Sequence, residues 1–136
     1  MLSIGELARR TGVKVPTIRY YEQVGLLDRP GRTEGNQRRY GRPELERLTF
    51  VRHARDLGLT IDAIRELIEL NGHPDRPCAE ADRIARDHLA DVRRRIARLR
   101  LLERELERIS QCSHHTVGEC RVLRTLADHD LCLDDH

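Results

Sequence analysis

Apolar residues along this chain recur at intervals of three and four, the spacing that places them on one face of an α-helix. The first such segment starts at Ser3, which with Glu6 forms a Ser-x-x-Glu capping pattern and predicts a helix over residues 3–10. A turn over residues 11–13 follows, and Pro16, a residue favoured in the first turn of helices, opens a second helical segment. The order is therefore helix, turn, helix, as in many DNA-binding domains.

The second helix has one apolar face and one face that can contact a ligand. Ile18 and Tyr21 lie three residues apart, so the same side of the helix carries both. Thr17, Arg19 and Tyr20 then lie on faces that look outward. This arrangement is typical of a recognition helix.

Residues 25–40 break the helical period with glycine, proline and a Gly-Asn pair at residues 35–36. The segment is also basic, with Arg29, Arg32, Arg38 and Arg39. We predict a basic β-hairpin, or wing, that follows the recognition helix.

Two further helices are expected before the middle of the chain. Pro43 opens the third helix and Gly58 ends it, whereas Thr60 caps the fourth, which runs as far as the Asn-Gly pair that ends at Gly72. Apolar residues at helical spacing face a common core in both helices.

No glycine or proline occurs from residue 79 to residue 110, which predicts one long amphipathic helix. Its apolar stripe consists of Leu89, Val92, Ile96, Leu99, Leu102, Leu106 and Ile109. This stripe is too narrow for an independently folded unit, so the helix needs a partner surface. An antiparallel coiled-coil homodimer is favoured over packing against the chain's own N-terminal domain.

The expected fold class is mainly α: a winged helix-turn-helix DNA-binding domain, a long dimerisation helix and a C-terminal metal-binding loop. We assign residues 1–72 to the DNA-binding domain with its connecting helices and residues 73–78, which include two prolines, to a linker. The dimerisation helix spans residues 79–110, the metal-binding loop and a short helix span residues 111–127, and a flexible tail spans residues 128–136.

Charge separates the two halves of this 136-residue chain. Residues 1–58 hold 12 Lys and Arg against 7 Asp and Glu, a balance of +5, and the remainder holds 13 against 16, a balance of −3. The basic half is the candidate for nucleic acid binding. No apolar run is long enough to span a bilayer and no signal peptide is evident, so we expect a cytoplasmic protein without a membrane partner.

Four cysteines in a reducing compartment are more typical of metal ligands, redox sensors or small buried residues than of a disulfide framework. Cys112 and Cys120 bound a short loop, and Cys78 precedes the long helix, which is roughly 50 Å long at about 1.5 Å per residue. Within one chain Cys78 therefore cannot share an ion with the loop. In an antiparallel dimer Cys78 of the partner subunit lies beside Cys112 and Cys120, which predicts two three-thiolate sites.

Soft thiolates favour cadmium, lead, mercury, zinc and copper(I). Structural or incidental cysteines remain a competing interpretation, because a Cys pair with seven residues between is weak evidence for metal when taken alone. His114 and His115 could add a nitrogen ligand, and that question stays open. Cys132 lies in an acidic tail and is left out of the predicted site.

The segments IGELARRTGVKVPTIRYYEQVGLL, GRTEGNQRRY and LTFVRHARDLGLTIDAIREL, followed by a long helix and a Cys-bounded loop, resemble the MerR family of transcription regulators. The resemblance implies a homodimer that binds double-stranded promoter DNA with an overlong spacer and distorts it for RNA polymerase. It assigns DNA contacts to Thr17, Arg19, Tyr20, Arg32, Arg38 and Tyr40. Gln37 departs from the aromatic residue that many metal-sensing relatives carry at that position.

The same resemblance matches Cys78, Cys112 and Cys120 to the thiol positions of sensors for divalent thiophilic metals. Copper(I) sensors carry serine at the position of Cys78, so the expected effector is cadmium or lead, then zinc, mercury and finally copper(I). A redox-responsive regulator is the related alternative. An enzyme is not expected, because no arrangement such as His-Glu-x-x-His supplies an open metal site with a general base. A structural coiled-coil adaptor does not explain the second helix with its Arg and Tyr residues or the basic wing.

Overall fold

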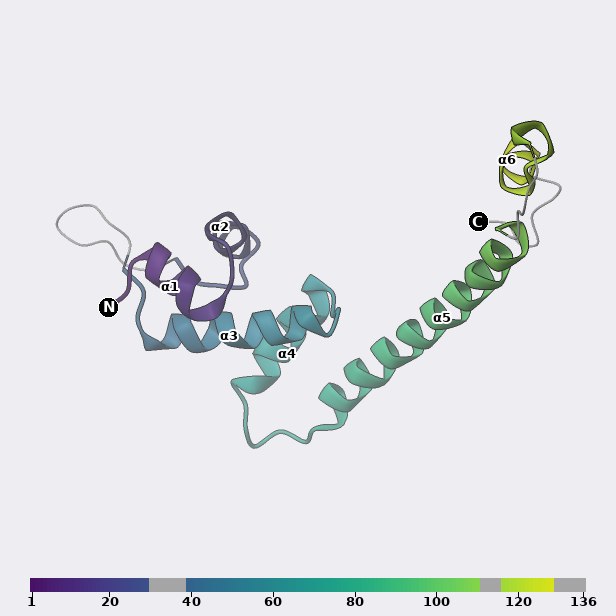
Figure 1. Cartoon of the computed structure of the whole chain (residues 1–136). Helices are drawn as coiled ribbons and strands as arrows, with labels where there is room; N and C mark the ends of the chain where they lie inside the picture. Colours follow the sequence, from purple (N-terminus) through teal and green to yellow (C-terminus); the bar gives the residue numbers. More distant parts are fainter. Residues whose placement is uncertain (30–38, 111–115, 129–136) are drawn as a thin grey trace. The chain divides into compact units, whose positions relative to one another are not determined.

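The computed structural model describes residues 1–29, 39–110 and 116–128, which are mainly helical (Figure 1). In chain order the elements are α1 (Ile4–Thr11), α2 (Val15–Gln23), α3 (Arg42–Asp56), α4 (Ile61–Asn71), α5 (Ala79–Ile109), the short 3-10 helix η1 (Val117–Glu119) and α6 (Arg121–Ala127). Two compact units, Met1–Ile84 and Ala85–His136, divide the chain within α5. The mainly helical class is confirmed.

Local side-chain signals set the helix ends where the sequence predicts them. The backbone N–H of Glu6 donates to Ser3 Oγ at 3.2 Å at the start of α1, and Ala63 N–H donates to Thr60 Oγ1 at 3.1 Å at the start of α4. These bonds satisfy N–H groups that the first turn of a helix leaves unpaired. Gly12 ends α1 with φ of 74°, a left-handed conformation that glycine adopts without strain.

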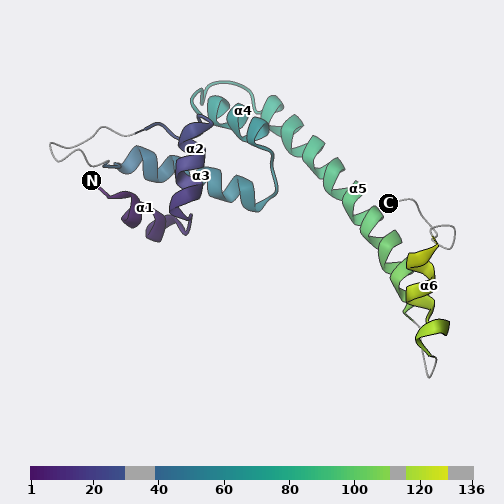
Figure 2. The ribbon, with the colours of Figure 1, turned by 90° about the horizontal axis from the view of Figure 1, so that it is seen from above.

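The core of the first unit lies among α1, α2, α3 and α4. In Figures 1 and 2, α2 runs crosswise to α3. The largest fully buried side chains are Leu7, Ile18, Leu26, Tyr40, Leu48, Val51 and Ile64, with Leu27 scarcely more exposed. Ile84, near the start of α5, is also buried in this core, and Arg83 pairs with Glu66 of α4 at 3.6 Å. Apolar packing thus joins the first turns of α5 to the N-terminal unit.

The predicted wing lies largely outside the described residues, since residues 30–38 are not among them. Within the part of the chain that the structure describes, the β-structure consists of a bridge between Leu2 and Tyr40. Each of these residues donates its N–H to the other's carbonyl oxygen at 2.7 Å. The hairpin itself stays a prediction.

Helix α5 is continuous and exposes most of the apolar stripe that the sequence predicts. Leu89, Ile96, Leu99 and Leu106 are exposed, Val92 and Leu102 are half-buried, and Ile109 is buried. A stripe of large apolar side chains on one long helix is the surface that a second helix covers in a coiled coil.

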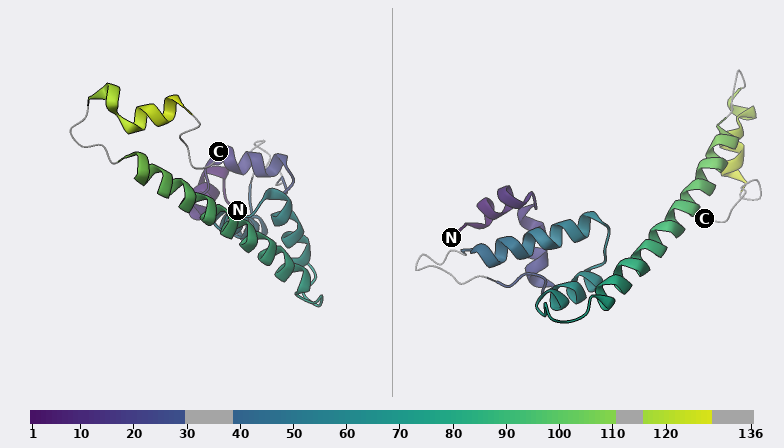
Figure 3. Two further views of the ribbon diagram at one scale, coloured as in Figure 1. Left: turned by 90° about the vertical axis from the view of Figure 1, so that its right-hand side faces the viewer. Right: turned by 90° about the horizontal axis from the view of Figure 1, so that it is seen from below.

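Helix α6 follows the 3-10 helix η1 near the C-terminal end of α5 (Figure 3). The Arg121 guanidinium donates to the carbonyl oxygen of Arg108 at 3.0 Å, which ties the first residue of α6 to the last turn of α5. Thr125 of α6 and Ile109 of α5 are buried in this second unit. Among the described residues, no helix combines the length and apolar character needed to cross a membrane.

Candidate DNA-binding surface and metal site

The recognition helix predicted from the sequence is α2, and it divides into the two faces expected. Ile18 and Tyr21 are buried in the core, whereas Arg19 and Tyr20 are exposed and Thr17 is half-buried. The helix begins after Lys14 in extended conformation, with proline in its first turn. Because core packing fixes one face, the polar side chains of the other face are held toward solvent.

Two arginines, one on α3 and one on α4, donate hydrogen bonds to carbonyl oxygens at the C-terminal ends of α1 and α2. The Arg52 guanidinium on α3 donates to the carbonyl oxygen of Thr11 at the end of α1 and lies over Gly12. The Arg65 guanidinium on α4 donates to the carbonyl oxygen of Val24, directly after α2, at 2.6 Å. Cations near helix C-termini pair with carbonyl groups that the helix leaves free.

Tyr40 departs from its predicted role as a DNA-backbone contact. Its side chain has no exposed surface, and its hydroxyl donates to Glu22 Oε1 on α2 at 3.2 Å. A phosphate cannot reach a fully buried hydroxyl, so the prediction for the Tyr40 side chain is wrong in this structure. The aromatic ring is part of the core of the first unit.

Two predicted wing contacts, Arg32 and Arg38, lie outside the described residues. The described residues that flank this segment include Arg29, which is exposed, and Arg39, which is half-buried. Both belong to the first unit and follow α2 in the chain. Both arginines therefore lie within the predicted wing, on either side of the residues that fall outside the described ranges.

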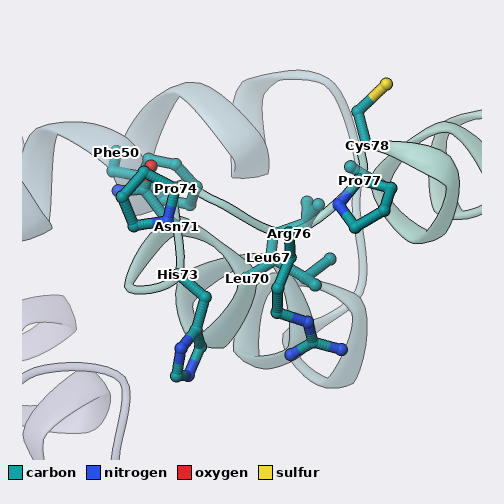
Figure 4. A pocket seen from close by; sticks show the side chains of 10 residues that line it. Phe50, Leu67, Leu70, Asn71, His73, Pro74, Arg76, Pro77 and Cys78 are labelled. Atoms are coloured by element: carbon teal, nitrogen blue, oxygen red, sulfur yellow. The ribbon is translucent and has the colours of Figure 1, made fainter.

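Cys78 is exposed and directly precedes α5, where its carbonyl oxygen accepts from Asp82 N–H at 2.9 Å. It lies at the rim of an open cavity of about 320 Å³, whose apolar lining includes Phe50 and Leu70 (Figure 4). In the figure the Cys78 sulfur and the His73 ring point in opposite directions. These two side chains consequently do not converge on one ion.

Cys120 is half-buried and is the residue directly before α6. Its N–H donates to the carbonyl oxygen of Val117 at 3.2 Å, and its own carbonyl accepts from Arg124 N–H at 3.0 Å. Backbone hydrogen bonds on both sides of Cys120 therefore fix the position of its Cα atom, from which the thiol extends.

The predicted ligand Cys112 and the two histidines whose role stays open, His114 and His115, lie outside the described residues. So does Cys132, which is not part of the predicted site. In the part of the chain that is described, no group of three His, Cys, Asp or Glu side chains is placed to hold a metal ion. The predicted three-thiolate site therefore stays a prediction.

Glu22, Arg52 and Arg65 were not singled out by the sequence patterns. Glu22 lies four residues after Ile18 and thus on the buried face of α2, which is the one available signal. Arg52 and Arg65 each bond to a carbonyl 41 residues away, and no local pattern marks such a pairing.

The helical fold, the exposed Arg19 and Tyr20 on its second helix and the basic N-terminal half define a helix-turn-helix DNA-binding protein. The model of the MerR HTH family regulatory proteins matches residues 2–70, and the model described as "MerR, DNA binding" matches residues 45–109. This chain belongs to the MerR family of transcription regulators. It carries a DNA-binding domain of the MerR type, and its family consists of regulators and not of enzymes.

Relatives match over almost the full length of the chain. The HTH-type transcriptional regulator ZntR of Escherichia coli is 38% identical, over 93% of this chain and 92% of the relative. The mercuric resistance operon regulatory protein of Shigella flexneri is 37% identical, over 92% of this chain and 87% of the relative. The crystal structure of the transcription regulator PbrR691 from Ralstonia metallidurans, in complex with lead(II), superposes with a TM-score of 0.79 at 41% identity and covers 93% of this chain and 99% of that one.

Proposed function

We propose that this protein is a metal-responsive MerR family regulator that binds promoter DNA as a homodimer and activates transcription when a thiophilic divalent metal ion is bound. The observation that carries the proposal is the placement of thiols around α5. Cys78 directly precedes this helix, and Cys120 follows it at the start of α6. The predicted third thiol, Cys112, also follows α5 in the sequence.

A metal site that contains all three thiols requires a dimer, because α5 separates Cys78 from the other two thiols of the same chain. Its 31 residues span roughly 46 Å at about 1.5 Å per residue. A metal–thiolate bond is only about 2.3 Å long, so one ion cannot join thiols at the two ends of such a helix. Antiparallel pairing through the exposed apolar stripe brings Cys78 of the partner subunit beside Cys112 and Cys120.

Lead and cadmium are the metals that we place first, followed by zinc and mercury. Three thiolates form a soft ligand set, which suits these ions better than magnesium or calcium. The similarity to a regulator solved with lead(II) and to a mercuric resistance regulator supports the same class of effector. Copper(I) comes last, because Cys78 adds a third thiol to the loop pair.

The proposed mechanism uses the connection between α5 and the DNA-binding unit. Ile84 is buried in the core of that unit six residues after Cys78, and Arg83 pairs with Glu66 of α4. Metal held by Cys78 and the partner's loop would bias the orientation of the two DNA-binding units toward the one that bends and untwists the promoter for RNA polymerase. The free energy of metal binding would then favour the distorted conformation of the promoter over the undistorted one.

Titration of the reduced dimer with lead(II) and, separately, copper(I) tests the proposal, with thiolate-to-metal charge-transfer absorbance as the readout. We expect lead bands that Cys78→Ser and Cys120→Ser each abolish, whereas Cys132→Ser leaves them unchanged. Tight copper(I) binding together with lead bands that persist in Cys78→Ser would replace the divalent-metal proposal with a copper(I) regulator. Activation of metal-free protein by oxidant would favour a redox regulator.

A further inference from the structure

The buried contact between Glu22 and Tyr40 connects the recognition helix to the chain that returns from the predicted wing. Glu22 lies in the last turn of α2 and is only 7% exposed, and Tyr40 has no exposed surface. The Tyr40 hydroxyl donates to Glu22 Oε1 at 3.2 Å. A buried hydroxyl and a buried carboxylate require partners, because transfer from water without a hydrogen bond is costly.

The other end of the wing segment is fixed to the same turn of α2. The N–H groups of Leu26 and Leu27 both donate to the carbonyl oxygen of Tyr21, at 2.9 and 3.3 Å. Both leucine side chains are buried in the core. Two adjacent residues of α2, Tyr21 and Glu22, therefore hold the two chain ends that enter and leave residues 28–39.

Tyr40 is also fixed on its far side. Its backbone exchanges two hydrogen bonds with Leu2, and the next residue, Gly41, donates its N–H to Glu44 Oε2 at 2.7 Å at the start of α3. The side-chain hydroxyl links Tyr40 to α2 through Glu22, and the ring packs in the same core as Ile18 and Tyr21. Removal of the hydroxyl leaves the backbone contacts and the buried ring in place and takes away this hydrogen bond to the recognition helix.

We propose that the Glu22–Tyr40 hydrogen bond is a positioning contact for DNA binding, which holds the basic chain around Arg39 at a fixed place relative to the recognition helix. The exposed Arg19 on α2 and the flanking Arg29 and Arg39 then share one rigid support. Folding already holds these cations at fixed positions, so DNA binding does not have to pay the entropy cost of ordering them. They can therefore contact several phosphates at the same time. Glu22 and Tyr40 act through these arginines and do not touch DNA.

The test variant is Tyr40→Phe, which removes the hydroxyl and retains the buried ring. Binding of the metal-free protein to a fluorescently labelled mixed-sequence duplex is followed by anisotropy over a range of salt concentrations. We expect binding about tenfold weaker, because a displaced arginine loses its phosphate contact. We also expect the slope of log affinity against log salt to fall by about 1, because each phosphate contact contributes about 0.9.

The salt slope separates positioning from a simple loss of stability. A partly unfolded sample lowers the affinity at every salt concentration and leaves the slope unchanged, whereas a displaced cation lowers the slope. Thr49→Val is the matched control, because it removes a hydroxyl that donates within α3 to Leu45 at 2.8 Å. We expect wild-type affinity and slope for this control.

Glu22→Met removes the acceptor from the other side, with an unbranched side chain that suits a buried helical site. Since both substitutions break the same hydrogen bond, the double variant should bind no more weakly than the weaker single variant. Wild-type affinity and slope for Tyr40→Phe, or additive losses in the double variant, would overturn the proposal. The experiment contains no metal, so it is independent of the proposed metal response.

Discussion

The exposed apolar stripe of α5 leads to a quantitative prediction for Leu99→Ala. Leu99 lies in the middle of the stripe and is 63% exposed in the single chain. Leu101 on the same helix is 43% exposed but lies two positions further on, about 200° around the helix axis. If the stripe forms a coiled-coil interface, Leu99→Ala weakens the dimer, whereas Leu101→Ala, the matched control, does not.

The size of the effect follows from the exposed fraction. Full burial of a leucine side chain contributes about 1.5–3 kcal/mol, so the 63% left exposed corresponds to about 1–2 kcal/mol in each protomer. A two-fold symmetric dimer contains the substitution twice, which gives about 2–4 kcal/mol. The dimer dissociation constant should therefore rise by roughly 30-fold to 1000-fold. Alanine retains helix propensity, so α5 itself is preserved.

Sedimentation equilibrium of the reduced, metal-free protein over a concentration series measures this constant directly. The wild type and Leu101→Ala should dissociate at the same concentration, and Leu99→Ala at a much higher one. Equal dissociation of the two variants would show that α5 pairs through a different face or that its stripe packs elsewhere. Far-ultraviolet circular dichroism, which reports helix content, checks that both variants keep α5 helical.

Two other substitutions test the DNA-binding unit. Gly12→Ala places a β-carbon at φ of 74°, where it collides with the Arg52 guanidinium, and should lower the free energy of unfolding by about 1–2 kcal/mol or more. An unchanged midpoint of urea unfolding in Gly12→Ala would contradict the left-handed conformation at Gly12. Arg19→Ala removes an exposed side chain from α2 and should weaken promoter binding by about 1–3 kcal/mol at an unchanged urea midpoint. Full promoter affinity in Arg19→Ala would remove this residue from the proposed DNA contacts.

Much of the helical framework could be predicted because its signals are local. Ser3 and Thr60 cap helices with their own side chains, and Gly12 ends α1 where a left-handed residue is required. The unbroken run from Ala79 to Ile109 forms the predicted long helix. In each case the residues that decide the structure lie within one or two turns of each other.

The three-thiolate metal site remains a prediction. The sequence supplies Cys78 and Cys120, and the structure places each directly before a helix. Whether these thiols meet in one site depends on a second copy of the chain and on Cys112, outside the described residues. Spacing along one chain contains no information about that arrangement, so dimerisation must be measured.

Tyr40 shows the limit of transferring roles by motif. The resemblance to the MerR family assigned it a contact with the DNA backbone, yet the side chain is buried in the core and its hydroxyl donates to Glu22. The sequence by itself determined the helices, their order and the family, because short-range capping and apolar periodicity encode them. Only the tertiary structure decided which polar groups are buried. The pairs Glu22–Tyr40 and Arg65–Val24 join residues 18 and 41 positions apart, and packing of distant segments, not local preference, brings them together.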